Sequence, residues 1–211
     1  LTIGLEGMNK NKIFEKIEIK DTEFSNRIVV SPMCQYSAEN GLMNDWHFQH
    51  LSQFGFSGAG LVMIESTAVE NIGRITHNCT GIYNDDCLSS IKAIMEKVKA
   101  ISLNEVKFGI QLGHAGRKAS TQRPWEGRSY LRHNQNPWKT IAPSAIPFDK
   151  DWPIPQEMNE DDLQRVKTAF IDATKRSVKA GFDLIEIHAA HGYLFHQFIS
   201  PISNQRKDKY G

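Results

Sequence analysis

Short apolar runs alternate with longer segments of helical periodicity along this chain, and this alternation constrains the fold more than any other feature. Consecutive parallel strands need a crossover connection, usually a helix, and such crossovers are right-handed. The alternation therefore predicts an α/β fold with a parallel sheet, either doubly wound or part of a (β/α)8 barrel. We expect buried strands at 27–33, 60–65, 106–112 and 183–187, joined by helices at 44–58, 85–101 and 159–181.

Capping residues support the helix assignments. Asn44 or Asp45 can cap the first helix. At the start of the third helix, Asn159 and Asp162 resemble an N-cap and its partner three residues later, and Gly181 can close that helix. The helix boundaries are therefore encoded locally.

The number of repeats predicts only part of a barrel. A complete barrel takes about 250 residues or more. This chain has 211 residues and spends many of them on the segment 113–158, which is rich in Pro, Trp, Gly and Arg and lacks sustained periodicity. An excursion of that length is usually a functional loop or disordered. We expect a (β/α)8 TIM barrel of which about the first four βα units are present.

The ends of the chain suggest the same reading. Met8 resembles a natural start, so residues 1–12 are expected to be an N-terminal extension. Residues 13–211 are then expected to be the N-terminal half of the barrel, cut after Gly211 shortly after a helix start.

Composition argues against several classes of partner. The formal net charge is +1, from 25 basic and 24 acidic residues, and this near-balance gives no electrostatic case for nucleic acid or an anionic membrane. No stretch approaches the roughly 18 apolar residues of a membrane span. Cys34, Cys79 and Cys87 are an odd number without a signal-like segment, which favours a reducing, cytoplasmic setting.

Chemically reactive side chains follow each expected strand. They include a thiol and a phenol at Cys34 and Tyr36, a hydroxyl at Ser66, an amide at Gln111, and a pair of imidazoles at 188 and 191 followed by a phenol at 193. The carboxyl ends of neighbouring parallel strands lie at one rim, where loops carry chemistry. Together these groups can hydrogen-bond a flat heterocycle rich in carbonyls and ring nitrogens.

These motifs resemble the old yellow enzyme family of FMN-dependent ene-reductases, and specifically its thiol-dependent branch, often named NADPH dehydrogenase. The resemblance covers the chain from about Ile13 to Gly211. The segment 124–127 is similar to the bacterial xenobiotic-reductase subgroup. The matching motifs occur in the family's order at 31–36, 111–118, 188–193 and 200–206.

The resemblance implies a set of FMN contacts and a reductant, NADPH. At position 66 the family more often has alanine, so the hydroxyl of Ser66 is a mild departure. The cysteine would lie near the isoalloxazine and tune its potential. The expected cofactor-binding residues are Ser31, Pro32, Met33, Cys34, Ser66 and Gln111.

The resemblance also implies a reaction, the reduction of the C=C bond of an α,β-unsaturated carbonyl compound. His188 and His191, with the intervening Ala189 and Ala190, would bind the carbonyl oxygen, on which enolate charge develops. Tyr193 would donate a proton to the α-carbon, and its unperturbed pKa near 10 keeps it protonated. Tyr36 would be a second phenol over the substrate. NADPH and the enone would occupy one site in turn, which implies ping-pong kinetics. The full-length protein is expected to be a homo-oligomer.

Family members hold the FMN phosphate with groups from the last two strands and place an arginine from the fifth strand against the flavin. The four repeats here do not include those strands. This polypeptide alone is therefore expected to bind FMN weakly or not at all.

Two other functions are consistent with the residues. The half-barrel could be an inactive module for assembly or interaction. Alternatively, His188 and His191 could bind zinc with Cys34 or His196 in a barrel hydrolase, although no further ligand falls in register and no metal is expected. Arg117 and Lys118 could lie near the flavin or form a solvated pair. Three tryptophans could line a substrate entrance or pack the excursion: Trp125, Trp138 and Trp152.

Overall fold

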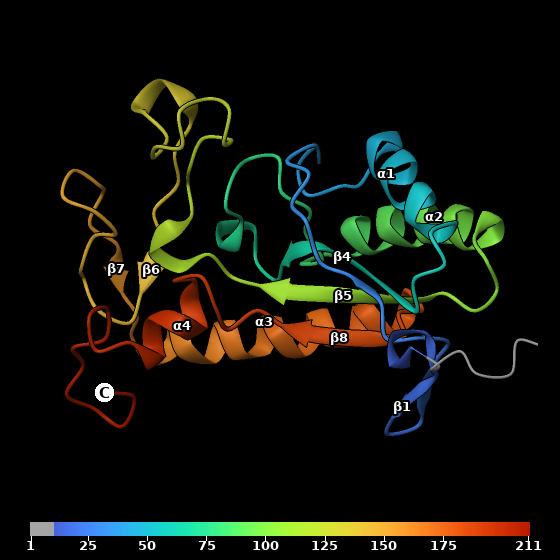
Figure 1. The fold of residues 1–211 in the computed structure, drawn as a ribbon. Helices are drawn as coiled ribbons and strands as arrows, with labels where there is room; N and C mark the ends of the chain where they lie inside the picture. The colour runs from blue at the N-terminus through green and yellow to red at the C-terminus, as the bar shows by residue number, and fades with distance from the viewer. Residues whose placement is uncertain (1–10) are drawn as a thin grey trace, which may run out of the picture.

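Four parallel strands form the central sheet, and they lie side by side in the order in which they occur along the chain (Figure 1). The computed structural model describes residues 11–211. The strands are β3 (Val29–Val30), β4 (Leu61–Ala68), β5 (Lys107–Gly113) and β8 (Leu184–Ile187). The crossovers contain α1 (Asp45–Gly55), α2 (Asp85–Ile101) and α3 (Glu160–Lys179), and α4 (Leu194–Ile199) follows β8. This sequential order is that of an arc of a (β/α)8 barrel.

The helices begin where the capping residues predict. The side chain of Asn44 accepts a hydrogen bond at the start of α1, and His47 completes a capping box. Asn159 and Asp162 form the predicted capping box of α3. Gly181, with φ of +81°, follows the end of α3 in the left-handed conformation that closes many helices.

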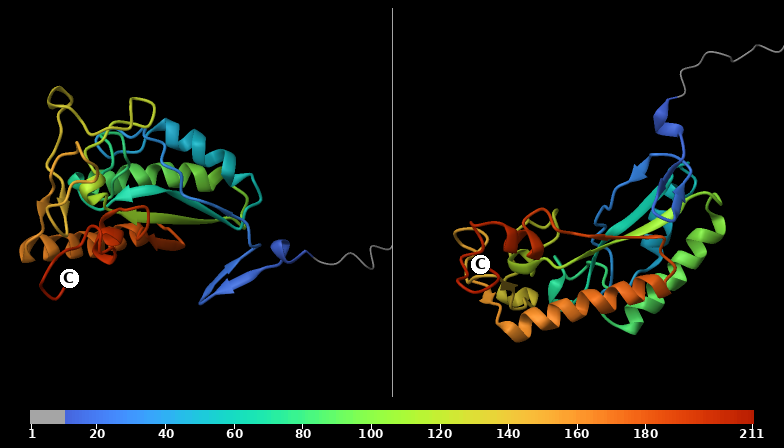
Figure 2. Two further views of the ribbon diagram at one scale, coloured as in Figure 1. Left: turned by 60° about the vertical axis from the view of Figure 1, so that its left-hand side comes forward. Right: turned by 90° about the horizontal axis from the view of Figure 1, so that it is seen from below.

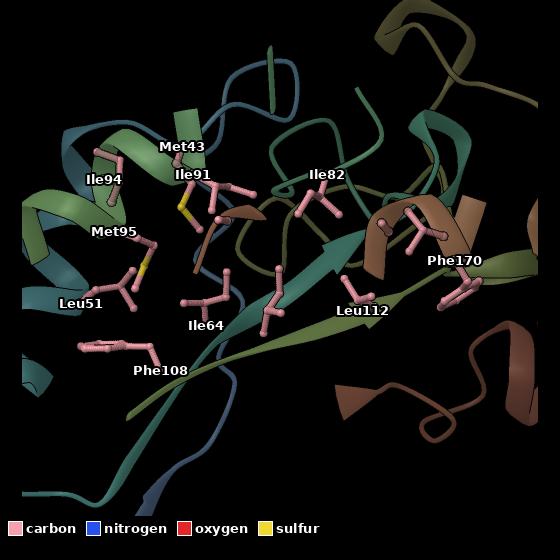
Figure 3. Packing of buried hydrophobic residues seen from close by; sticks show 14 of the residues in the cluster. Met43, Leu51, Ile64, Ile82, Ile91, Ile94, Met95, Phe108, Leu112 and Phe170 are labelled. Atoms are coloured by element: carbon pink, nitrogen blue, oxygen red, sulfur yellow. The ribbon is translucent and has the colours of Figure 1, made fainter. Parts of the chain in front are cut away.

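Side chains from alternate strand positions build the core between the sheet and its helices. Ile64 of β4 and Phe108 of β5 lie near Leu51 of α1 and Met95 of α2, whereas Leu112 of β5 lies beside Phe170 of α3 (Figure 3). In Figure 2, α2 and α3 run along the same face of the sheet. Burial of this apolar face is what holds the helices against the sheet.

The opposite face of the sheet has a smaller apolar cluster at the amino-terminal ends of the strands. A hairpin of β1 (Ile17–Ile19) and β2 (Thr22–Phe24), which the sequence did not predict, packs there (Figure 1). Its Phe24 lies against Leu61 and Met63 of β4. The hairpin thus provides an apolar floor beneath the inner face.

The prediction that the first and fourth strands are buried is wrong. Val29 of β3 is 52% exposed and Ile187 of β8 is 46% exposed. These strands are the two edges of the sheet, so each has a neighbour on one side only. The central strands β4 and β5 are buried as predicted.

The excursion at 113–158 is ordered rather than disordered. It contains the 3-10 helices η3 (Gly116–Lys118) and η4 (His133–Gln135), and the parallel pair β6 (Ile141–Ala142) and β7 (Gln156–Glu157). Hydrogen bonds to the rest of the fold hold this segment in place, although its sequence lacks helical or strand periodicity.

The expected extension at 1–12 lies mostly outside the described residues, and Lys12 begins the 3-10 helix η1 (Lys12–Phe14). None of the helices in residues 11–211 has the length and apolar character needed to cross a membrane.

Candidate functional site

The carboxyl ends of the four strands converge on one rim, as the sequence predicts. Ser66 on β4 pairs with Gln111 on β5, and Gln111 pairs with Glu186 on β8. A Cβ on Gly113 would lie 2.8 Å from Ser66 Oγ and 3.5 Å from His188 Cβ. The absence of a side chain at Gly113 thus leaves room between these two groups.

Three aromatic rings meet just beyond β8. The ring centroids of His188 and His191 are 5.1 Å apart, those of His188 and Tyr193 are 4.9 Å apart, and those of His191 and Tyr193 are 6.4 Å apart. His188 is buried, and its backbone N–H donates to the carbonyl of Leu112, 2.8 Å away. The structure therefore brings together the three residues predicted to be catalytic.

A left-handed turn presents His191 and Tyr193. His191 has φ of +57° and Gly192 has φ of +73°. Lys118 Nζ donates to the His191 carbonyl at 2.7 Å and lies 5.0 Å from the centre of the Tyr193 ring. The amide of Gln197 on α4 donates to the Gly192 carbonyl at 2.7 Å. Lys118 and Gln197 thus position the turn, and no sequence motif pointed to Gln197.

The protonation states of the site are set by burial and by local hydrogen bonds. The backbone N–H of Ala190 donates to His188 Nδ1 at 3.3 Å, which assigns the ring hydrogen to Nε2. Burial lowers the pKa of His188, and the neighbouring His191 adds to this. Burial also raises the pKa of the Tyr193 phenol, with a further contribution from Cys34. At neutral pH, His188 is therefore a neutral donor and Tyr193 keeps its proton.

Cys34 and Tyr36 lie on the loop after β3, close to Tyr193. Burial raises the pKa of the Cys34 thiol, and the negative charges possible at Cys79 and Glu65 raise it further. The same factors raise the pKa of Tyr36, with burial the largest. The ring of Tyr36 packs edge-on against Trp125, with centroids 5.8 Å apart. At neutral pH the thiol and both phenols are therefore uncharged.

Glu65 holds the loop that carries Cys34, a role that the sequence did not reveal. The carboxylate is almost fully buried, with 4% of the residue exposed. Its Oε2 accepts from the backbone N–H of Gln35 at 3.1 Å. Its Oε1 accepts from the Thr80 hydroxyl at 3.0 Å and lies 3.1 Å from His47 Nε2. Glu65 thereby ties the loop after β3 to α1 and to the segment before α2.

Replacing Glu65 with alanine is expected to lower the free energy of unfolding by about 3–5 kcal/mol, because it leaves several buried donors without an acceptor. The matched variant Glu65→Gln keeps the shape and one acceptor oxygen, so it should cost clearly less. Urea unfolding followed by circular dichroism measures both. A loss below about 1 kcal/mol for the alanine variant would show that the loop does not depend on this carboxylate.

The inner face of the sheet fits a flat, polar heterocycle. Gln111 is buried, and its amide donates to Glu186 Oε1 at 2.5 Å. Next to this pair lie the Ser66 hydroxyl and the backbone of Gly113, which the hydroxyl approaches closely, above an apolar floor that includes Met63. Hydroxyl, amide and carboxylate groups above an apolar surface can bind the isoalloxazine of FMN. Glu186 belongs to this donor set, although the sequence did not single it out.

The remaining predicted residues are less closely gathered. Ser31 and Met33 are exposed on the loop after β3, and Pro32 between them is half-buried; the carbonyl of Met33 accepts from Gln35 Nε2 at 2.8 Å. Ala189 and Ala190 are exposed between the two histidines. Among the described residues, no hydrogen bond joins residues 31–33 to Gln111.

Neither Arg117 nor Lys118 is a simple solvated side chain. Arg117 Nη1 donates to the carbonyls of Ile146 and Pro147, each at 3.1 Å. Burial lowers the pKa of Lys118. Within residues 11–211 no group of three or more His, Cys, Asp or Glu side chains is arranged to hold a metal ion.

Known proteins match the chain along almost its whole length. The family model described as "NADH:flavin oxidoreductase / NADH oxidase family" matches residues 12–211. An NADH:flavin oxidoreductase of Gibberella zeae is 43% identical over 99% of this chain and 51% of its own length. An NADPH dehydrogenase of Listeria innocua is 43% identical over 95% of this chain and 55% of its own length. The chain thus spans about half the length of the curated relatives it matches.

Solved structures agree with the predicted fold. The old yellow enzyme from Pichia sp. AKU4542 superimposes with a TM-score of 0.81 at 28% identity, covering 96% of this chain and 52% of that one. Morphinone reductase superimposes with a TM-score of 0.77 at 23% identity, which supports the fold alone. These neighbours are TIM barrels, so the prediction of a partial (β/α)8 barrel is confirmed.

Proposed function

Because this chain belongs to the NADH:flavin oxidoreductase / NADH oxidase family, we propose that it is the N-terminal half of an FMN-dependent enzyme that uses NADPH to reduce the C=C bond of α,β-unsaturated carbonyl compounds. Residues 13–211 would form the first half of the barrel, with the excursion at 113–158 above its rim. We place the enzyme in the cytoplasm, in keeping with its free cysteines. We also propose that the full-length protein is a homo-oligomer.

The observation that carries this proposal is the convergence of His188, His191 and Tyr193 at the rim. The Nε2–H of His188 is available to an incoming oxygen, since the other ring nitrogen already accepts a backbone N–H. His191 lies beside it, with a ring centroid 5.1 Å away. Two imidazole donors directed at one carbonyl oxygen would stabilise the negative charge that develops there during reduction.

The inner face of the sheet would hold the cofactor. Gln111, Ser66 and Glu186 would bind the polar edge of the FMN ring, and the loop at 31–34 would lie along it with the uncharged Cys34 thiol against the ring. FMN supplies the hydride chemistry when it is bound.

Tyr193 would complete the reaction by moving a proton. Its phenol remains protonated well above neutral pH because burial raises its pKa, and it would protonate the α-carbon of the substrate. Lys118 and Gln197 would keep this phenol in place through the turn at 191–193. Tyr36 would form the other wall of the substrate site.

Anaerobic spectroscopy of the full-length protein loaded with FMN, and not of polypeptide 1–211 alone, tests the proposal. NADPH should bleach the yellow flavin band, and 2-cyclohexenone added afterwards should restore it, in two separable steps. If NADPH bleaches the flavin but no unsaturated carbonyl compound restores it, the protein is an NADPH oxidoreductase with another acceptor. If the flavin is not bleached, the proposed reductant is wrong.

The polypeptide 1–211 by itself is expected to bind FMN weakly or not at all. Its described residues would supply groups for the ring, and the chain spans about half the length of its relatives. The resemblance to the old yellow enzyme family implies that the phosphate-binding groups belong to strands outside that half. A titration of FMN fluorescence with the isolated polypeptide should show no stoichiometric quenching at micromolar concentrations. Tight binding with one FMN per chain would contradict this expectation.

An apolar groove favours the alternative function, an inactive module for assembly. It lies between α3 and α4, has a volume of about 500 Å³, and is lined by side chains that include Leu163, Phe170, Phe195 and Phe198. The strand that precedes α4 in the sequence, β8, is an exposed edge of the sheet. Light scattering distinguishes this alternative from the proposed enzyme. An assembly module should self-associate without FMN, and Phe195→Glu should abolish that association.

A further inference from the structure

The excursion encloses a second cavity, separate from the rings at 188–193. Its volume is about 350 Å³, within the range of small-molecule sites. Aromatic and basic side chains line it, and no carboxylate does. The residues that matter are Arg117, Arg132, Lys139, Tyr130, Trp138 and Trp152.

The basic groups of this cavity have no acidic partners among residues 11–211. None of Arg117, Arg132 and Lys139 lies within ion-pair distance of a described carboxylate, although ion pairs are common elsewhere in the chain. The Nε of Arg117 is buried and makes no hydrogen bond within the described part of the chain. Arg132, Tyr130 and Trp152 also line an adjoining hollow that contains Asp149 and Asp151, but Arg132 forms no ion pair with either carboxylate. A set of cations without counter-ions attracts an anion.

The aromatic side chains are held in place by their neighbours. Trp138 Nε1 donates to the carbonyl of Ile72 at 2.9 Å. The Tyr130 ring lies 4.2 Å from the guanidinium carbon of Arg132. Trp152 packs edge-on against Phe148, with centroids 4.9 Å apart. Rings beside cations can bind a flat base and the phosphate attached to it.

A short series of contacts joins this cavity to the candidate active site. Lys118 Nζ lies 5.0 Å from the centre of the Tyr193 ring and 4.9 Å from that of Phe148. Phe148 in turn packs on Trp152, which lines the cavity. Arg117, next to Lys118 in η3, lines the cavity directly. The two sites are thus separated by little more than Lys118 and Phe148.

We infer that this cavity binds the phosphorylated adenosine end of NADPH while the nicotinamide lies at the rim. The inference rests on the proposed function, since it assumes that NADPH is the reductant. The tryptophans and Tyr130 would stack on adenine, and Arg132 and Lys139 would pair with the 2′-phosphate, which NADH lacks.

A direct binding test uses 2′,5′-ADP as the probe and tryptophan fluorescence as the signal, because Trp138 and Trp152 line the cavity. The probe should quench the tryptophan fluorescence saturably. Arg132→Gln and Lys139→Gln should each weaken the affinity for the probe about 10-fold, because each variant loses one charge-assisted hydrogen bond. Both side chains are exposed, so the variants should fold. Arg128→Gln, exposed in the same excursion but outside the cavity, should leave the affinity unchanged. Unchanged affinity in both cavity variants, or no saturable quenching, would overturn the inference.

Steady-state kinetics of the FMN-loaded protein separates this inference from the proposed function. The double variant Arg132→Gln/Lys139→Gln should raise KM for NADPH about 100-fold, with KM for NADH and kcat unchanged. If enones are reduced and KM for NADPH does not move, the cavity inference fails and the proposed function stands. If no enone is reduced but the variants still lose affinity for 2′,5′-ADP, the cavity inference stands and the proposed function fails.

Discussion

Replacement of Tyr193 by phenylalanine is expected to slow enone reduction by about 10²–10⁴-fold in the FMN-loaded protein, the usual contribution of a positioned general acid. The ring remains, so its packing 4.9 Å from His188 and 5.0 Å from Lys118 Nζ is retained while the proton is lost. Flavin reduction by NADPH needs no proton from Tyr193 and should keep its rate. Stopped-flow absorbance measures the two half-reactions separately.

The comparison of half-reactions is what makes the Tyr193 variant informative. Tyr36→Phe removes the other phenol of the site and is the matched control, which should affect the oxidative half-reaction far less. Equal losses in both half-reactions of Tyr193→Phe would mean that the phenol shapes the site instead of donating the proton.

Double replacement of His188 and His191 by alanine is expected to weaken the binding of phenolate ligands by about 10²–10⁴-fold. Such ligands carry negative charge on an oxygen, as the enolate does before its α-carbon is protonated. A hydrogen bond to a charged group contributes about 1.5–3 kcal/mol, and two imidazoles would provide two of them. Titration with 4-hydroxybenzaldehyde, followed by the change in the flavin spectrum, gives the affinity.

His133→Ala is the control for the histidine pair, because His133 is exposed in the excursion at the start of η4. It should leave phenolate affinity unchanged. The single variant His188→Ala should lose more phenolate affinity than His191→Ala. His188 is buried, and the backbone N–H that donates to its Nδ1 fixes its own hydrogen on Nε2. Wild-type affinity in the double variant would exclude the imidazoles from the oxygen-binding site.

Local sequence signals predicted the parts of the fold that depend on neighbouring residues. The capping box of Asn159 and Asp162 and the closing Gly181 identified α3, because each contact spans only a few positions. Apolar runs identified β4 and β5 for the same reason. The hairpin β1–β2 was missed, since its three-residue strands carry too little pattern to stand out.

The sequence predicted which residues gather at the candidate site but only part of how they are arranged. The motif at 188–193 identified two histidines and a tyrosine, and the structure brings their rings together. The roles of Glu65 and Glu186 depend on partners far away in the sequence: Glu65 and Gln35 are 30 positions apart, and Gln111 and Glu186 are 75 apart. No local pattern reports contacts of that range.

The sequence by itself determined the order of strands and helices, the helix boundaries, the family, and the residue types at the strand ends, because periodicity, capping and motifs are read over a few consecutive positions. Only the tertiary structure decided that β3 and β8 are exposed edges, that the excursion is ordered around a basic and aromatic cavity, and that His188 carries its hydrogen on Nε2. Exposure, cavities and tautomers depend on which distant groups meet in space, and that is settled when the sheet and its loops pack together.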